Sequence, residues 1–192
     1  MSELSECKRC ELHDGDVHPV PGEGGVSASV MFVGRDPGAN ENVLGRPFVG
    51  AAGKFLREEI HRYFGNKSEH DVYITNLVKV HTLNNIGPSS SNIEACSYHL
   101  KREIIYINPK IIVALGKVVT VALLNKVCDT SDLPRYIDIH NCPMWRIVDN
   151  KYNININSHS YVVVPCYHPS PRNRSFYGVI SGVIRDVKES LT

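Results

Sequence analysis

The sequence lacks several features that would assign it to a broad class. No apolar run reaches the roughly 18 residues that cross a membrane. The N-terminus is polar and charged, without the apolar segment of a secretory signal peptide. No Gly-rich phosphate loop follows the first apolar segment, which disfavours a nucleotide-binding protein. We therefore expect a protein of the cell interior that is not secreted and has no membrane partner.

A strong net charge is also missing. The chain has 21 Lys and Arg against 20 Asp and Glu, which gives a net charge of +1 at pH 7. Composition therefore does not indicate a nucleic-acid partner, and binding to one has to depend on a local group of cations. The length of 192 residues and the 42% of hydrophobic residues predict a single domain over residues 1–192, with a core of its own.

Six cysteines are present: Cys7, Cys10, Cys96, Cys128, Cys142 and Cys166. Disulfide bonds are not expected, because thiols stay reduced inside the cell. Cys7 and Cys10 are separated by two residues. In an intracellular chain this spacing indicates metal or redox chemistry more often than a disulfide bond.

Short apolar segments alternate with segments of helical periodicity. Strands are predicted at residues 28–33, 72–80, 111–115 and 161–164. Helices are predicted at residues 50–63, 91–107, 118–125 and 177–191, with Ser91 as N-cap of the second and Glu94 completing a capping box. Residues 1–25 are predicted to form an arm rich in loops, and residues 127–160 to form loops with a short hairpin.

This alternation predicts an α/β fold, specifically a three-layer α/β/α sandwich around a four-stranded, mostly parallel sheet. In such sheets ligands bind in the crevice beyond the carboxyl ends of the strands. The segments after the first, second and fourth strands carry Asp36, Asn85 and His168. We therefore expect these three residues to lie in one active-site crevice.

Five segments identify a family, and they occur in the family's order. They are residues 33–38, 45–54, 72–79, 108–116 and 167–170. The combination of Gly-Arg-Pro-Phe-Val-Gly with the later His-Pro-Ser is the most specific part. By these motifs the chain resembles the uracil-DNA glycosylase superfamily, and most closely its iron–sulfur family four.

The resemblance implies an enzyme of base excision repair. Such an enzyme flips uracil out of single- or double-stranded DNA, hydrolyses the N-glycosidic bond and leaves an abasic site. The protein is then expected to be a monofunctional hydrolase and a monomer, in the cytoplasm or associated with the nucleoid.

The active-site residues differ from those of family four at two adjacent positions. Family four has Glu at Arg35 and a small residue at Asp36, whereas Gly-Arg-Asp-Pro is similar to the Gly-Gln-Asp-Pro of the first uracil-glycosylase family. His-Pro-Ser-Pro is likewise similar to a motif of that first family, in which the next residue is a Leu that wedges into the duplex. Here that residue is Arg172.

A second departure concerns the metal site. Family four binds a [4Fe–4S] cluster through four cysteines, of which Cys7, Cys10 and Cys96 match three. The fourth position is Val80, which cannot bind iron. The adjacent residue is His81, and imidazole can be a cluster ligand. We predict a cluster held by the three cysteines and His81, with zinc in a Cys₃His site or loss of the cluster as alternatives.

The resemblance also assigns catalytic roles. Cleavage of an N-glycosidic bond builds positive charge on the sugar and negative charge on the base. Asp36 would orient water and stabilise the sugar cation, with Glu41 as the rival carboxylate. His168 would donate a hydrogen bond to uracil O2. Asn85 matches a polar position near the sugar and the water.

Substrate binding is assigned to six residues: Gly34, Arg35, Phe48, Asn76, Ser170 and Arg172. The amide of Asn76 would accept from uracil N3–H and donate to O4, a pattern that cytosine reverses. Phe48 would stack on the flipped base. Ser170 would bind a phosphate or fix its loop, and the guanidinium of Arg172 would fill the space that the base leaves.

Three points stay open. Arg172, Arg174, Lys54 and Lys79 are candidates for a patch that binds phosphates. Gly38 lacks the bulk with which the first family's Tyr blocks thymine, so a 5-substituted uracil is an alternative substrate. A catalytically weak DNA-binding or accessory module is the alternative function, because Arg35 and Val80 replace family residues.

Overall fold

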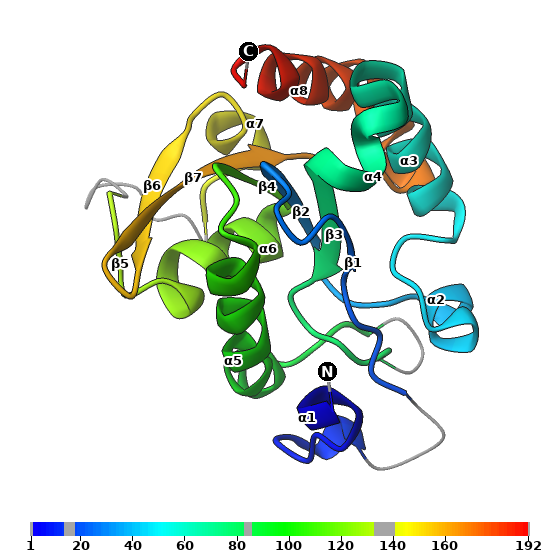
Figure 1. Ribbon diagram of the computed structural model, residues 1–192, viewed down its shortest axis with the longest axis vertical. Helices are drawn as coiled ribbons and strands as arrows, with labels where there is room; N and C mark the ends of the chain where they lie inside the picture. The colour runs from blue at the N-terminus through cyan, green and yellow to red at the C-terminus, as the bar shows by residue number, and fades with distance from the viewer. Residues whose placement is uncertain (1, 14–17, 83–85, 133–140, 192) are drawn as a thin grey trace.

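A mixed β-sheet forms the centre of the protein (Figure 1). The computed structural model describes residues 2–13, 18–82, 86–132 and 141–191. Within these residues the sheet has seven strands in the order β1-β3-β2-β4-β7-β6-β5. Their bounds are Glu23–Gly24 (β1), Val30–Gly34 (β2), Val72–Asn76 (β3), Ile111–Leu115 (β4), Thr130–Ser131 (β5), Tyr152–Ile156 (β6) and His159–Cys166 (β7).

The four predicted strands are β2, β3, β4 and β7, and neighbouring strands among them pair in parallel. The α/β class is therefore confirmed. The predicted size of four strands is wrong, because β1, β6 and β5 extend the sheet in antiparallel pairing. β1 and β5 have two residues each, which is too short to produce a period in the sequence.

β6 forms a hairpin with β7, the fourth predicted strand, so the hairpin extends beyond residues 127–160, where a short hairpin was predicted. In β6 the side chains alternate between buried and exposed, with Asn153 and Asn155 on the exposed side. Asn157 and Ser158 form the turn and have φ values of 49° and 66°. Positive φ at both turn residues matches the right-handed twist of the flanking strands.

Helices cover both faces of the sheet. Their bounds are Ser2–Ser5 (α1), Ala39–Leu44 (α2), Ala51–Phe64 (α3), Ser68–Asp71 (α4), Ser90–Ile107 (α5), Lys117–Ala122 (α6), Met144–Ile147 (α7) and Tyr177–Glu189 (α8). Short 3-10 turns span Glu11–His13, Gly65–Lys67 and Pro171–Phe176, and a π-helical turn spans Leu123–Val127.

Two hydrophobic cores result from this layering. Alternate residues of a strand point to opposite faces. Val30 and Phe32 of β2 therefore pack with residues of α3 and α8, while Met31 and Val33 pack with residues of α5 and α6. The arrangement is the predicted three-layer sandwich. In the part of the chain that the structure describes, no helix has the length and apolar character needed to span a bilayer.

The predicted start of α5 is wrong by two residues. Ser89 is the N-cap, and its hydroxyl accepts from the backbone N–H of Asn92 at 3.1 Å. The Asn92 side chain accepts from the backbone N–H of Ser89 at 2.9 Å, which completes the capping box. An amide oxygen thus takes the place that the sequence pattern assigned to Glu94. The helix ends as predicted, at Asn108 in the left-handed conformation.

The N-terminal arm packs against α5, which lies above it in Figure 1. Arg102 of α5 forms an ion pair with Glu3. The guanidinium of Arg9 lies 3.7 Å from the ring centroid of Tyr98, and Asn92 donates to Glu11 at 2.8 Å. Polar and cation–π contacts therefore dock the arm onto one face of the helix.

Candidate functional site

A cavity of about 690 Å³ opens at the carboxyl ends of β2, β3, β4 and β7. The structure brings Asp36 and His168 together there, as expected for loops that follow parallel strands. Asn85 lies outside the described residues. Further predicted site residues that line the cavity are Arg35, Glu41, Phe48, Asn76, Ser170 and Arg172.

The loop after β3 is bonded to the loop after β2. The backbone N–H of Leu77 donates to the Gly34 carbonyl at 2.8 Å, and that of Val78 donates to the Arg35 carbonyl at 2.9 Å. Farther along, a ring nitrogen of His81 lies 2.7 Å from the Pro37 carbonyl oxygen. These contacts hold the loop that carries Asp36 at a fixed distance from the end of β3.

The carboxylate of Asp36 is held on both oxygens. Arg35 donates to Oδ1, and the hydroxyl of Thr82 donates to Oδ2 at 2.7 Å. The Asp36 side chain is only 6% exposed. Gly87, with φ of 85°, gives Arg35 room, because a Cβ there would lie 3.0 Å from the guanidinium carbon. The carboxylate therefore has one orientation at the wall of the cavity.

Gly34 allows Asn76 and Phe48 to approach each other. It lies opposite Asn76 in the parallel register of β2 and β3. A Cβ at Gly34 would lie 2.4 Å from Asn76 Oδ1 and 2.5 Å from Phe48 Cζ. Gly34 does not line the cavity itself. We therefore assign it the task of making room for the buried amide and ring that do.

Glu41 holds the loop that carries Phe48. Its Oε1 accepts from the backbone N–H of Val49 at 2.8 Å and from that of Gly50 at 2.7 Å. Phe48 has a positive φ of 55°, which is uncommon for a residue with a side chain. The buried carboxylate of Glu41 thus stabilises the turn that places the Phe48 ring in the cavity.

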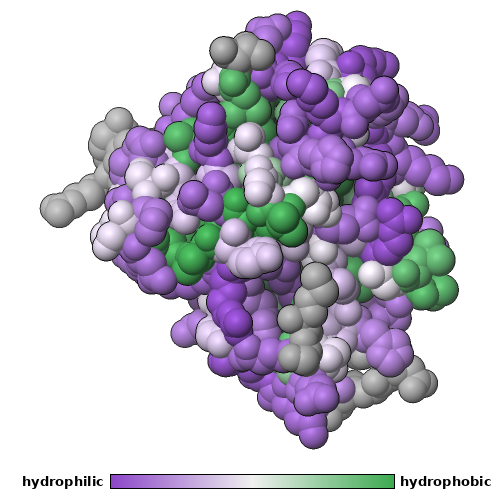
Figure 2. Space-filling model, in the orientation of Figure 1, coloured by the Kyte–Doolittle hydropathy of each residue, from purple (hydrophilic) through white to green (hydrophobic). Residues whose placement is uncertain are grey.

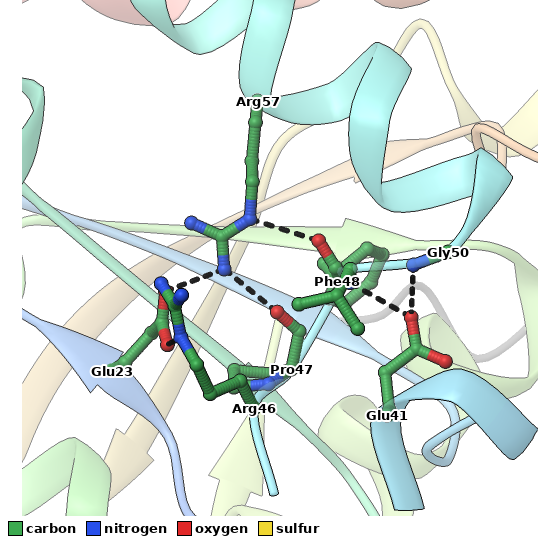
Figure 3. Close-up of polar contacts among 8 residues, drawn as sticks. Glu23, Glu41, Arg46, Pro47, Phe48, Gly50 and Arg57 are labelled. Atoms are coloured by element: carbon green, nitrogen blue, oxygen red, sulfur yellow. Dashed lines mark hydrogen bonds and ion pairs between the residues drawn. The ribbon is translucent and has the colours of Figure 1, made fainter. Parts of the chain in front are cut away.

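Arg57 holds the same loop from the other side (Figure 3). Its guanidinium donates to the Phe48 carbonyl at 2.8 Å and to the Pro47 carbonyl at 2.7 Å. Glu23 pairs with Arg57 and with Arg46. The sequence analysis missed Arg57 and Glu23. Glu23 is 34 positions away from Arg57 along the chain, and no motif joins the two.

His168 lines the same cavity. Its pKa is lowered from the ordinary value of 6.5, chiefly because burial disfavours the charged ring and also because Arg35 is nearby, while Asp36 opposes the shift. The ring centroid lies 6.3 Å from that of Phe48. Asn173 donates to the His168 carbonyl at 2.8 Å and fixes the loop. The imidazole is therefore expected to be neutral at pH 7 and able to donate one hydrogen bond.

The mouth of the cavity carries cations. Arg172 and Lys117 line it, and Arg172 is exposed. Lys117 is the first residue of α6, directly after the turn at Gly116 that follows β4, and the sequence analysis did not include it among the site residues. The available signal in the sequence was Gly116 directly after a buried strand, and in the structure this residue has a φ of 100°.

Lys79 is not part of a phosphate-binding patch. Its side chain is fully buried, and its ammonium donates to Glu103 at 2.5 Å. It also donates to the Thr75 hydroxyl at 2.6 Å and to the Asn76 carbonyl at 2.7 Å. The expectation of a surface cation is wrong here, and Lys79 instead holds the end of β3 that carries Asn76.

Comparison with known proteins identifies the family. Residues 21–183 match the model of the uracil DNA glycosylase superfamily. The chain belongs to this superfamily. It is 37% identical to the type-4 uracil-DNA glycosylase of Saccharolobus solfataricus over 192 residues, covering 99% of this chain and 84% of that protein.

Two further relatives carry the same type-4 name. The protein of Sulfurisphaera tokodaii is 38% identical over 168 residues, covering 88% of this chain and 71% of that protein. The protein of Archaeoglobus fulgidus is 34% identical over 170 residues, covering 88% of this chain and 79% of that protein. Within the superfamily the chain therefore groups with the type-4 glycosylases.

A second, small cavity of about 20 Å³ lies between the N-terminal arm and α5. Cys7, Cys10 and Cys96 all line it, as does Val80. His81 does not line it, because its ring is bonded to the Pro37 carbonyl beside the large cavity. The position of His81 therefore does not support its predicted role as a metal ligand. The three cysteines do meet at one place.

Proposed function

We propose that this member of the superfamily is a uracil-DNA glycosylase that removes uracil from DNA by hydrolysis. The observation that carries the proposal is the juxtaposition of the Asn76 amide, the Phe48 ring, Asp36 and His168 around one cavity. These groups suit an enzyme that reads a base edge, stacks on its face and stabilises opposite charges on base and sugar. The type-4 glycosylase names of the relatives support the same activity.

Recognition of uracil rests on a buried amide in one orientation. Asn76 is 3% exposed, and Gly34 and Lys79 fix its surroundings. An amide can accept from uracil N3–H while it donates to O4, whereas cytosine offers the reverse pattern and leaves buried polar groups unpaired. A base reaches such a cavity only when it is single-stranded or flipped out of the duplex, and Phe48 supplies the surface for stacking.

Hydrolysis requires an anion near the sugar and a donor near the base. Asp36 is proposed to orient water toward C1′ and to stabilise the positive charge that develops there. The C1′–N1 bond breaks, its electron pair leaves with the uracil, and the water oxygen bonds to C1′. The water gives up one proton to solvent, and the uracil anion takes up one proton from solvent. His168 donates a hydrogen bond to O2 as negative charge grows on the base. The products are free uracil and an abasic site.

Glu41 is proposed to act as a positioning residue. Its Oε1 already accepts from two backbone amides of the Phe48 loop. The role predicted for Asn85, at the sugar and the water, is proposed unchanged. Arg172, Lys117 and Ser170 at the mouth are proposed to bind phosphates, and Arg172 to fill the space that the flipped base leaves.

A [4Fe–4S] cluster is proposed at the three cysteines. Cys7 and Cys10 come from the arm, Cys96 comes from α5, and thiolates are the usual ligands of such clusters. When bound, the cluster would cross-link the arm to the helix. None of the proposed steps of hydrolysis depends on it.

The test is an oligonucleotide with a single uracil, incubated with the protein and then treated with alkali to break the abasic strand. Parallel substrates carry thymine, cytosine, 5-hydroxymethyluracil or hypoxanthine. We expect cleavage at uracil that His168→Ala strongly reduces. Binding without release of any base, at any protein concentration, would instead support a DNA-binding accessory module. A 5-substituted uracil cut faster than uracil would change the assigned substrate.

A further inference from the structure

The cysteine cavity has a fourth candidate ligand that the sequence pattern does not show. Three thiols leave one position of a [4Fe–4S] cluster without a protein ligand. Val80 lines the cavity at the position of the family's fourth cysteine, but its side chain has no donor atom. A fourth protein ligand would therefore come from another wall of the cavity.

His99 lies on that other wall. It follows Cys96 by three residues in α5, a spacing that places both side chains on the same face of the helix. Both residues are 7% exposed and both line the cavity. The Nε2 atom of His99 is 3.1 Å from the Sγ atom of Cys7. A ring nitrogen of His99 is therefore already in contact with one of the three thiols.

We propose that His99 is the fourth protein ligand of the cluster, together with Cys7, Cys10 and Cys96. The inference rests on the cluster given under the proposed function, and it replaces His81 in the ligand set. The arm then supplies two ligands and α5 supplies two.

Two other histidines are excluded by their positions. The His81 ring is bonded to the Pro37 carbonyl beside the large cavity. His13 lines the cysteine cavity, but it is exposed, and its Nδ1 lies 2.6 Å from the Cys10 carbonyl oxygen. Of these rings, only His99 combines burial with contact to a cysteine sulfur.

The donor set suits an iron–sulfur cluster, because three of the four side chains are thiols. Among the described residues, no three His, Cys, Asp or Glu side chains are already arranged around one metal-ion position. The ligands of a [4Fe–4S] cluster bind different iron atoms, so they do not converge on one point. The backbone N–H of Lys79 also donates to Cys96 Sγ at 3.3 Å, which is the kind of contact that tunes cluster sulfurs.

The test compares His99→Cys and His99→Ala with His81→Ala and His13→Ala as controls. Each protein is purified without oxygen and analysed for iron and acid-labile sulfide. The reduced cluster is examined by pulsed electron paramagnetic resonance, with isotope-labelled histidine identifying a bound ring nitrogen. Electrochemical titration gives the reduction potential.

We expect about four irons per chain in the wild type and in both controls, with strong nitrogen coupling. His99→Cys should keep the iron, lose the coupling and have a lower reduction potential, because a thiolate anion replaces a neutral ring. His99→Ala should lose iron and sulfide. The assignment is overturned if the coupling survives in His99→Cys or disappears in His81→Ala or His13→Ala.

Uracil release, measured on the same samples, separates this inference from the proposed function. A wild-type protein that releases uracil but binds no metal after reconstitution overturns the ligand assignment and leaves the glycosylase standing. A cluster that depends on His99, in a protein that releases no base, supports the ligand assignment and overturns the proposed glycosylase activity. One zinc per chain, lost in His99→Ala, keeps His99 as a ligand and overturns the cluster.

Discussion

The two cavities of this protein show different relations between sequence and space. The large cavity is built on four parallel strands whose ends lie at one edge of the sheet. The cysteine cavity is built where an arm of short turns meets one face of α5. In the first, Asp36, Asn76 and His168 lie where strand topology predicts. In the second, His81, which follows Val80 in the sequence, lies beside the large cavity instead. His99, one helical turn after Cys96, contacts a thiol.

The largest expected effect is a loss of kcat in variants of the large cavity alone. His168→Ala and Asp36→Asn should each lower kcat for uracil release by about 10²–10³-fold, the loss typical of removing one group that stabilises charge in a transition state. Single-turnover assays give the rate, and circular dichroism checks the fold. His61→Ala is the control, because His61 is an exposed residue of α3. Full activity in both site variants would show that the site is assigned wrongly.

The next largest effect is expected from a substitution that disturbs the close packing at the end of β2. Gly34→Ala introduces a Cβ into the space taken by the Asn76 amide and the Phe48 ring. Displacement of these groups by about 1 Å should cost roughly 10²-fold in kcat/KM. The control is Gly182→Ala in α8, where an added Cβ meets no atom within 4 Å. Equal activity of the two variants would contradict the role assigned to Gly34.

A smaller effect concerns the loop that carries Phe48. Glu41→Ala leaves the backbone amides of Val49 and Gly50 without their acceptor, so the free energy of unfolding should fall by about 2 kcal/mol. Urea unfolding measures this change. Glu58→Ala on the exposed side of α3 should change stability by less than about 0.5 kcal/mol. An unchanged stability in Glu41→Ala would remove its positioning role.

The smallest effect is a pH dependence at His168. Because its folded-state pKa is lowered by burial, the unfolded chain binds this proton more readily than the folded chain. The free energy of unfolding should therefore decrease as the pH falls below about 6.5, and His168→Asn should remove part of that decrease. Nuclear magnetic resonance of the ring should give a pKa below 6.5. A value above 6.5 would reverse the sign of the expected dependence.

Much of the large cavity was predictable from sequence because short buried strands end in recognisable loops. Asp36, Asn76 and His168 each follow or end a parallel strand. Because the carboxyl ends of parallel strands lie at one edge of the sheet, the topology brings these residues together. The support of the site was not predictable. Arg57 and Glu23 act on the Phe48 loop through contacts between distant parts of the chain. The sequence alone predicts a surface cation at Lys79, because its partner Glu103 is 24 positions away along the chain.

The cations around the site are not the set that the sequence predicted. Arg172 is exposed at the mouth, but Lys79 is buried and paired. In Figure 2 the visible face is mostly hydrophilic, with apolar side chains at the right-hand edge over α2. Val43 and Leu44 of that helix are 82% and 62% exposed. Composition reported the net charge correctly but not where individual charges are neutralised.

The most direct test of the account is the release of free uracil from a single-stranded oligonucleotide, measured side by side for wild type, His168→Ala and His99→Cys. The account predicts rapid release by the wild type, a loss of about 10²–10³-fold in His168→Ala, and near wild-type release by His99→Cys with its cluster retained. No release by the wild type, or equal loss in both variants, would contradict the separation of a catalytic cavity from a structural metal site.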